Sequence, residues 1–225
     1  MNGARMKPIA LIAALLLLSG CDSTGASDYT LYYQALRQSF AGGFGGSPHV
    51  TKDQAAAIPY ASIGYRLNDG PEQLLVLATD SGGDQLWTSG AHVVIVTRGG
   101  RIVRTVGLAQ DVSAVTPQKG QQISGPAKAR EKNLSSVRLE DFPSIPTYGV
   151  AVKCTAIPKD IETIVILGRG VTTRKVDETC RSDLLDWSFI DSYWIDPQSA
   201  LVWRSIQHVS PNRDKIEIET LRPAG

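Results

Sequence analysis

The stretch HVVIVTRGGRIVRTV, residues 92–106, decides the fold class that the sequence predicts. Two runs rich in β-branched residues, 92–97 and 101–106, flank Arg98-Gly99-Gly100. Valine and isoleucine favour extended strands, and two adjacent glycines accept the positive φ angles that tight hairpin turns need. The stretch therefore predicts a β-hairpin.

Strand-like runs separated by turn residues continue on both sides of this hairpin, from Tyr60 to the end of the chain. They lie at residues 60–67, 74–79, 85–88, 148–155, 161–168, 171–176, 187–196, 201–209 and 215–219. Neither a βαβ spacing nor a long helix is evident after Phe40. We therefore expect a mainly all-β protein whose antiparallel sheet is strongly curved into a sandwich or an incomplete barrel.

Two segments of this region carry more specific expectations. Residues 117–146 are basic and polar, which favours a solvated loop with a short strand or helix inside it. In the hairpin formed by 187–196 and 201–209, a loop of three residues, 197–199, places Tyr193 opposite Trp203 and Trp194 opposite Val202.

An amphipathic α-helix is expected ahead of the strands. Asp28 is a typical N-cap, and Tyr29, Tyr32, Tyr33, Leu36 and Phe40 recur on one helix face. The basic side of this helix is limited to Arg37, so we expect it to pack on the sheet rather than lie on a membrane. A short helix over residues 54–57, capped by Thr51 and ended by Pro59, should follow.

The N-terminus has the features of an export signal. Arg5 and Lys7 precede an apolar run, 9–18, that is too short for a membrane-spanning helix of roughly 20 residues. Leu18-Ser19-Gly20-Cys21 then resembles the lipobox of bacterial lipoproteins, so Cys21 would carry diacylglycerol and an N-linked, palmitate-type acyl chain. The alternative is an ordinary signal with an incidental cysteine.

This interpretation divides the chain into a signal peptide at 1–20, a lipidated polar tether at 21–27 and a single β-rich domain at 28–225. The sequence has 23 basic and 22 acidic side chains, and two of the basic ones, Arg5 and Lys7, leave with the signal. The mature protein is therefore nearly neutral, which gives no electrostatic basis for binding nucleic acid.

Cys154 and Cys180 are the cysteines that remain after lipidation. An even pair in an oxidising envelope compartment predicts a disulfide. Two thiols alone are a poor metal site, and a redox motif would need the C-x-x-C spacing.

The sequence offers little for catalysis. A G-x-S-x-G motif is missing, and His49, His92 and His208 are scattered without a metal-ligand spacing, so we predict no catalytic residue, metal or cofactor. One carboxylate cluster could form a glycosidase site beside aromatic residues. Its members are Asp183, Asp186, Asp191 and Asp196, next to Trp187, Tyr193 and Trp194.

We favour a simpler interpretation of that cluster, in which Asp191 belongs to a strand face and Asp196 to a turn. Paired aromatics in a hairpin usually form core, but a solvent-facing member could contact a sugar or a partner. The candidates for such a contact are Tyr193, Trp194 and Trp203.

Several segments resemble a known family in the same order along the chain. They are IPYASI at 58–63, LLVLA at 74–78, Trp87, the hairpin VTRGGRIVRTVGL at 96–108, Phe189, YWID at 193–196 and VWRS at 202–205. Together they resemble the YjbF/GfcB lipoproteins. The resemblance implies an outer-membrane lipoprotein encoded with exopolysaccharide or group 4 capsule genes, needed for production or export of the polymer and without a known catalytic site.

The resemblance carries over no functional residue other than Cys21. It implies that the protein contacts the membrane through lipidated Cys21. Its other candidate partners are products of an exopolysaccharide gene cluster and the polysaccharide itself. Asp22 departs from this pattern, because aspartate after the lipidated cysteine can retain a lipoprotein in the inner membrane.

Two functions are therefore weighed. The first is a non-enzymatic accessory lipoprotein of exopolysaccharide secretion. It would use its sheet edges or the basic segment at 117–146 to hold partner proteins or an acidic polymer. The second is a lipid or lipoprotein carrier, because a curved sheet with a helical lid can enclose an apolar cavity. A cavity lined by aliphatic residues would favour the carrier, and a filled core the accessory protein.

Overall fold

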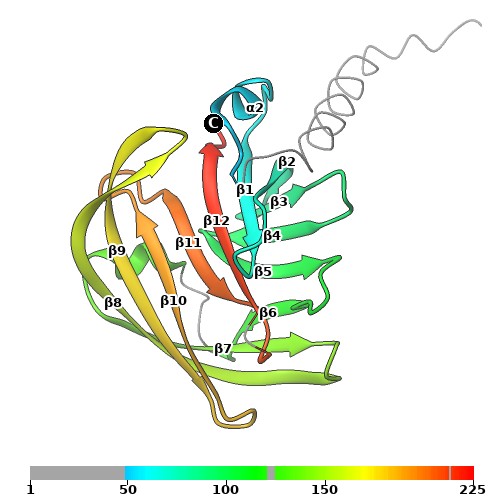
Figure 1. The fold of residues 1–225 in the computed structure, drawn as a ribbon. Helices are drawn as coiled ribbons and strands as arrows, with labels where there is room; N and C mark the ends of the chain where they lie inside the picture. The colour runs from blue at the N-terminus through cyan, green and yellow to red at the C-terminus, as the bar shows by residue number, and fades with distance from the viewer. Residues whose placement is uncertain (1–48, 121–124, 213) are drawn as a thin grey trace, which may run out of the picture. The chain divides into compact units, whose positions relative to one another are not determined.

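A single antiparallel sheet dominates the computed structural model, which describes residues 49–120, 125–212 and 214–225 (Figure 1). Its twelve strands are β1 (Ser62–Leu67), β2 (Gln73–Ser81), β3 (Asp84–Thr88), β4 (Val94–Arg98), β5 (Arg101–Val106), β6 (Ala114–Pro117), β7 (Leu134–Phe142), β8 (Thr147–Ile166), β9 (Arg169–Ser182), β10 (Trp187–Ile195), β11 (Val202–His208) and β12 (Lys215–Arg222). A short helix, α2 (Lys52–Ala56), precedes them, and a 3₁₀ turn, η1 (Pro126–Arg130), precedes β7. The predicted fold class is confirmed.

The sheet is a meander in which nearly every strand pairs with its neighbour in sequence. The order is β5-β4-β3-β2-β1-β12-β11-β10-β9-β8-β7-β6, so the β1–β12 pair joins the two ends of the strand series. The free edges are consecutive strands, β5 and β6, and the sheet curves until these edges meet. There Thr105 N donates to Val112 O at 2.8 Å, and Arg104 Nε donates to Ser113 O at 3.0 Å. The result is an incomplete barrel with a narrow seam.

The expectations for the first 48 residues lie outside the described part of the chain. They comprise the signal at 1–20, lipidation of Cys21, the tether and the helix at 28–40. The described residues all belong to one compact unit, Gln34–Gly225. Within them, no helix is long and apolar enough to cross a membrane.

The capping prediction for α2 is confirmed. Thr51 Oγ1 accepts a hydrogen bond from Gln54 N at 3.2 Å, and Gln54 Oε1 accepts one from Thr51 N at 2.8 Å. This reciprocal capping box satisfies two backbone donors at the start of the helix. The helix itself begins at Lys52, directly after the predicted cap, and ends at Ala56, one residue before the predicted end.

The prediction for residues 117–146 missed a long strand. β7 spans nine residues of this segment and pairs with both β6 and β8. Its inward positions include Arg138 and Glu140, which are buried. Charged residues at core positions remove the apolar alternation on which strand prediction depends, so the segment resembled a solvated loop.

The predicted register of the β10–β11 hairpin is wrong. Tyr193 pairs with Ser205, Trp194 with Arg204 and Ile195 with Val202, with an irregularity after Trp194. The loop is longer than three residues because Asp196 organises it: Asp196 Oδ1 accepts from Gln198 N and Ser199 N, both at 2.8 Å, and Asp196 N donates to Leu201 O.

The β4–β5 hairpin predicted for residues 92–106 is confirmed, with Gly99 at φ 55° and Gly100 at φ 83°. Gly100 also lies against the opposite wall of the barrel. A Cβ atom at this position would come within 2.3 Å of Val202 Cγ2 in β11. Gly100 is therefore required both by its backbone angle and by the close approach of two walls.

Replacing Gly100 by alanine should reduce stability more than the same change at Gly83. Both glycines have positive φ, which costs an L-residue roughly 1–2 kcal/mol, but a Cβ at Gly83 meets no atom within 4 Å. The contact with Val202 should add about 1–3 kcal/mol of overpacking to Gly100→Ala. Urea unfolding of the two variants measures the difference, and equal losses would contradict the close approach.

Candidate functional site

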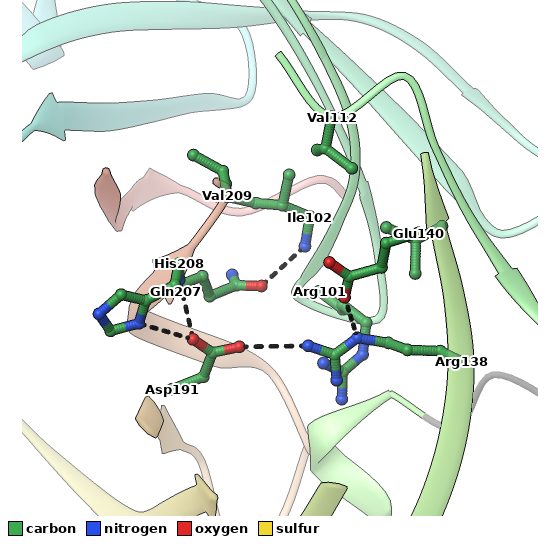
Figure 2. A pocket seen from close by; sticks show the side chains of 10 residues that line it. Arg101, Ile102, Val112, Arg138, Glu140, Asp191, Gln207, His208 and Val209 are labelled. Atoms are coloured by element: carbon green, nitrogen blue, oxygen red, sulfur yellow. Dashed lines mark hydrogen bonds and ion pairs between the residues drawn. The ribbon is translucent and has the colours of Figure 1, made fainter. Parts of the chain in front are cut away.

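The barrel interior contains a cluster of buried charged side chains. Arg101 comes from the edge strand β5, Arg138 and Glu140 from β7, Glu178 from β9 and Asp191 from β10. Each is at most 5% exposed. We call these five residues the charge cluster; Figure 2 shows four of its side chains, from β5, β7 and β10, lying close together.

The charge cluster is held by charge-assisted hydrogen bonds. Arg101 binds Glu178 in a bidentate pair, with Nη1–Oε2 at 2.7 Å and Nη2–Oε1 at 2.9 Å. Arg138 Nη1 donates to the same Glu178 Oε2 at 3.1 Å, and Arg138 Nε donates to Glu140 Oε1 at 2.5 Å. Its Nη2 lies 3.6 Å from Asp191 Oδ2. Paired geometry of this kind compensates part of the large cost of removing charges from water.

Two residues of β11, Gln207 and His208, lie beside the charge cluster. His208 donates its backbone N–H to Asp191 Oδ1 at 2.8 Å, and its ring Nδ1 lies 3.1 Å from the same oxygen. Gln207 reaches across the interior, and its Oε1 accepts from Ile102 N of β5 at 2.9 Å (Figure 2). Its Nε2 donates to Gly100 O, just before β5, at 2.9 Å. The side-chain amide thus takes the place of a neighbouring strand at the barrel's seam.

The surroundings fix the ionisation of Glu178. Burial alone would raise the pKa of this carboxyl, but attraction by Arg101 and Arg138 and their hydrogen bonds outweigh it and lower the pKa to about 2. At Glu140 burial dominates over Arg138 and raises the pKa. Burial also raises the pKa of Tyr193 well above its usual value. Glu178 is therefore the ionised acceptor shared by both guanidinium groups.

The charge cluster has no room for a substrate. The space beside it, lined by cluster members together with His208 and Val209, has a volume of about 10 Å³. Such a space holds roughly one water molecule. Glycosidases need two carboxyl groups on either side of a bound sugar, and here Asp191 is 1% exposed and faces Arg138 and His208.

The other carboxylates of the predicted glycosidase cluster are not gathered at one site. Asp183 and Asp186 are exposed and pair with Arg181, and Asp183 also pairs with Lys153. Asp196 organises the β10–β11 loop. The geometry therefore agrees with the simpler interpretation of strand and turn residues.

The three aromatic candidates for sugar or partner contact occupy different places. Tyr193 is fully buried, and its hydroxyl accepts from Arg101 Nη1 at 3.2 Å. Trp194 and Trp203 lie beneath the tip of the β8–β9 hairpin, in a cluster with Ile164 and neighbouring apolar residues. Burial thus keeps Tyr193 from contacting a ligand at the surface, and packing covers much of Trp194 and Trp203.

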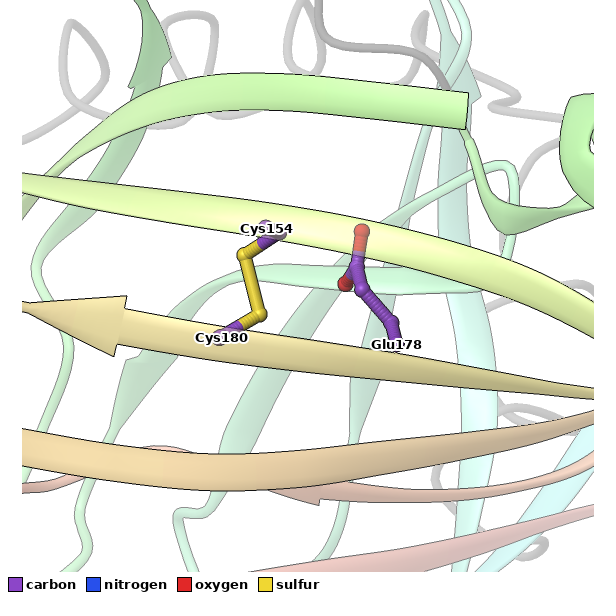
Figure 3. A group of neighbouring side chains, drawn as sticks. All are labelled: Cys154, Glu178 and Cys180. Atoms are coloured by element: carbon purple, nitrogen blue, oxygen red, sulfur yellow. A yellow bond between two sulfur atoms is a disulfide. The ribbon is translucent and has the colours of Figure 1, made fainter. Parts of the chain in front are cut away.

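The predicted disulfide is present. Cys154 in β8 and Cys180 in β9 are directly paired residues with Cα atoms 4.1 Å apart (Figure 3). Glu178 lies two residues before Cys180 on the same strand face, and Arg138 Nη1 donates to Cys154 Sγ at 2.9 Å. Both sulfurs are bonded to each other, so these three side chains offer no thiolate pair to a metal.

A larger cavity of about 340 Å³ lies at one end of the barrel. Its walls include Ile63, Trp87 and Ile218, and buried hydroxyl groups come from Thr97, Ser205 and Thr220. Its rim is formed by the turns after β2, β4 and β10 and by the segment after β12. In an antiparallel meander these connections share one end. Sequence reasoning raised an apolar cavity as part of the carrier hypothesis but named none of these lining residues, because they come from strands far apart in the chain.

Comparisons with known proteins agree on the family. The family model described as group 4 capsule polysaccharide lipoprotein gfcB, YjbF matches residues 33–221. The chain is 28% identical to the uncharacterized lipoprotein YjbF of Escherichia coli (strain K12) over 199 residues, covering 87% of this chain and 89% of that protein. It is 23% identical to the uncharacterized lipoprotein GfcB of the same organism over 221 residues, 97% of this chain and 100% of that protein.

A solved structure shows the same fold. The crystal structure of the hypothetical lipoprotein YmcC from Escherichia coli (K12) superposes with a TM-score of 0.68 at 21% identity. The match covers 92% of this chain and 99% of that one.

Replacing Glu178 by glutamine should destabilise the protein by about 3–5 kcal/mol at pH 7, because it leaves two buried guanidinium groups without their shared carboxylate. The lowered pKa of Glu178 stabilises the fold above the unfolded value of 4.5, and this contribution is lost as the pH falls towards 2. The difference in free energy of unfolding between wild type and Glu178→Gln should therefore be smaller by about 3 kcal/mol at pH 2 than at pH 6.

Denaturant unfolding at several pH values measures this gap, and Asp183→Asn is the matched control. Asp183 also pairs with basic residues, but it does so in solvent. The control should unfold like wild type at every pH. A gap for Glu178→Gln that stays constant with pH would contradict an ionised Glu178.

Removing the disulfide with Cys154→Ala and Cys180→Ala together should lower the free energy of unfolding by about 3–4 kcal/mol, since the bridge closes a loop of 26 residues. Denaturant unfolding measures the loss. Thiol labelling of unfolded wild type without reductant should leave both positions unmodified, and labelling at both would show that the bridge does not form.

Proposed function

The chain belongs to the YjbF family of group 4 capsule polysaccharide lipoproteins, and from this premise we propose that it is a non-enzymatic, membrane-anchored lipoprotein that supports production or export of a capsular or extracellular polysaccharide. The observation that carries the proposal is the match of the family model over residues 33–221, nearly the whole domain. Two relatives that are themselves named lipoproteins support it.

The proposed anchor is the lipidated Cys21 at the end of the export signal. Stable anchoring takes two acyl chains, which a diacylated cysteine provides. We place the domain on the periplasmic side of the outer membrane, with the inner membrane as the alternative because of Asp22. Intact-mass measurement of the membrane fraction tests the lipid, and separation of the two membranes on a sucrose gradient tests the location.

The described side chains support a binding role rather than hydrolysis. The inward carboxylates of Glu140, Glu178 and Asp191 are buried and face basic groups, and the space beside them holds about one water molecule. The larger cavity also disfavours the apolar carrier, because three buried hydroxyl groups lie in its lining. Thr97 and Ser205 accept hydrogen bonds there, and an acyl chain would leave their O–H groups without an acceptor, at a cost of roughly 1–3 kcal/mol each.

Deleting the gene in a polymer-producing strain should lower the surface polysaccharide, and wild-type protein should restore it. Cys21→Ala should fail to restore it, because the domain is no longer held at the membrane. Polysaccharide per cell is measured alongside the amount of protein in the membrane and soluble fractions. Asp183→Asn, which changes an exposed ion pair, should restore fully. Unchanged polymer after deletion would refute the proposed function.

A further inference from the structure

We propose that the 340 Å³ cavity at the end of the barrel, which we call the end cavity, binds a short neutral saccharide unit. This inference rests on the proposed function and names the chemical class that the domain recognises. The volume lies at the lower end of the roughly 300–1,000 Å³ range of small-molecule sites.

The end cavity offers hydroxyl groups that lack a complete set of partners. Thr97 Oγ1 accepts from Trp87 Nε1 at 2.9 Å, and Ser205 Oγ accepts from Gln207 Nε2 at 2.9 Å. Each keeps an O–H group for which no acceptor is found among the described residues. Thr97 and Ser205 are largely buried, 5% and 1% exposed, and both lie in the lining of the end cavity. Buried donors are normally satisfied, and a ligand with hydroxyl or ether oxygens would satisfy these two.

The third hydroxyl complements the first two. Thr220 Oγ1 donates to Val202 O at 2.9 Å, so its lone pairs remain available to accept. The cavity thus presents both donors and an acceptor on walls otherwise made of Ile63, Trp87 and Ile218. A pyranose ring has the matching surface, with hydroxyl groups around its edge and C–H bonds on its faces.

The charges of the lining decide between neutral and acidic sugars. Among the lining residues, all in the described part of the chain, Asp80 carries the only charge. It lies exposed at the rim and accepts from Gln85 Nε2 at 3.0 Å. An acidic sugar would find no cation in the cavity and would meet this carboxylate at the entrance. The end cavity therefore favours a neutral unit, unlike the acidic polymer expected from the basic segment at 117–146.

The rim is built to stay open. Gly83, Gly99 and Gly100 contribute no side chains there, and the small residue Ala224, which follows β12, is also in the lining. A tryptophan at Ala224 can fill the entrance, and because it follows the last strand it should leave the sheet unchanged.

The test uses the full lipoprotein in phospholipid nanodiscs, titrated with cellobiose, maltose and lactose by calorimetry and saturation-transfer NMR. Cellobiuronic acid is the charged comparison and a fluorescent fatty acid the apolar one. At least one neutral disaccharide should bind.

Ala224→Trp should weaken binding at least tenfold, and Ser205→Ala roughly three- to tenfold through one lost hydrogen bond. Thr172→Val on the exposed face of β9 is the matched control and should bind like wild type.

Three results would overturn the inference: no neutral sugar binds, binding is unchanged in Ala224→Trp, or the fatty acid enters in preference to sugars. Circular dichroism and thermal unfolding verify that each variant is folded. Polymer production in the deletion strain separates the two proposals. Full restoration by Ala224→Trp together with no sugar binding would remove the site and keep the function. Sugar binding blocked by Ala224→Trp, with unchanged polymer after deletion, would remove the function and keep the site.

Discussion

The bidentate pair between Arg101 and Glu178 is the interaction on which the barrel depends. Arg101 is the first residue of the edge strand β5, and Glu178 lies in β9 on the opposite wall. A curved sheet that stops short of closure leaves two edges with unpaired backbone groups, which invite association with other chains. Here one wall is joined to the other by side chains. The pair ties β5 across the interior, and the Gln207 amide supplies the hydrogen bonds that a neighbouring strand would have made at Ile102 and Gly100.

Closing the barrel with buried ion pairs requires more exact side-chain geometry than closing it with an apolar core would. A buried ion pair stabilises a fold only when its hydrogen bonds are well formed, because desolvation offsets much of the Coulombic attraction. Arg138 meets this demand by contacting Glu178, Glu140 and the Cys154 sulfur at once. The disulfide fixes β8 against β9 beside these contacts, so the covalent bond and the ion pairs restrict the same strands. Closure also shapes the cavity, because Gly100, next to Arg101, lies on its rim.

Local sequence patterns predicted most of the strands but not the interior. Period-two alternation, the Gly99-Gly100 turn and the Thr51 cap depend on neighbours in sequence, and each was predicted. The partners in the charge cluster are far apart: Arg101 and Glu178 are separated by 77 residues, and Arg138 and Glu178 by 40. β7 was missed for the same reason, since Arg138 and Glu140 fit a core only when Glu178 and Asp191 are already opposite them. The predicted register of the β10–β11 hairpin was wrong because of one side chain. Asp196 accepts hydrogen bonds from the loop backbone and so makes the loop longer than predicted.

The polar groups of the interior fall into two sets with different chemical capacities. The five residues of the charge cluster pair with one another and leave no space for a substrate. The hydroxyls of Thr97, Ser205 and Thr220 line the space that remains. Cleaving a glycosidic bond requires a proton donor and a second carboxylate beside the sugar. The carboxylates capable of that chemistry are already engaged in closing the barrel. In the role proposed for this protein, a cavity lined by hydroxyl groups and an indole would bind and release a sugar without cutting it.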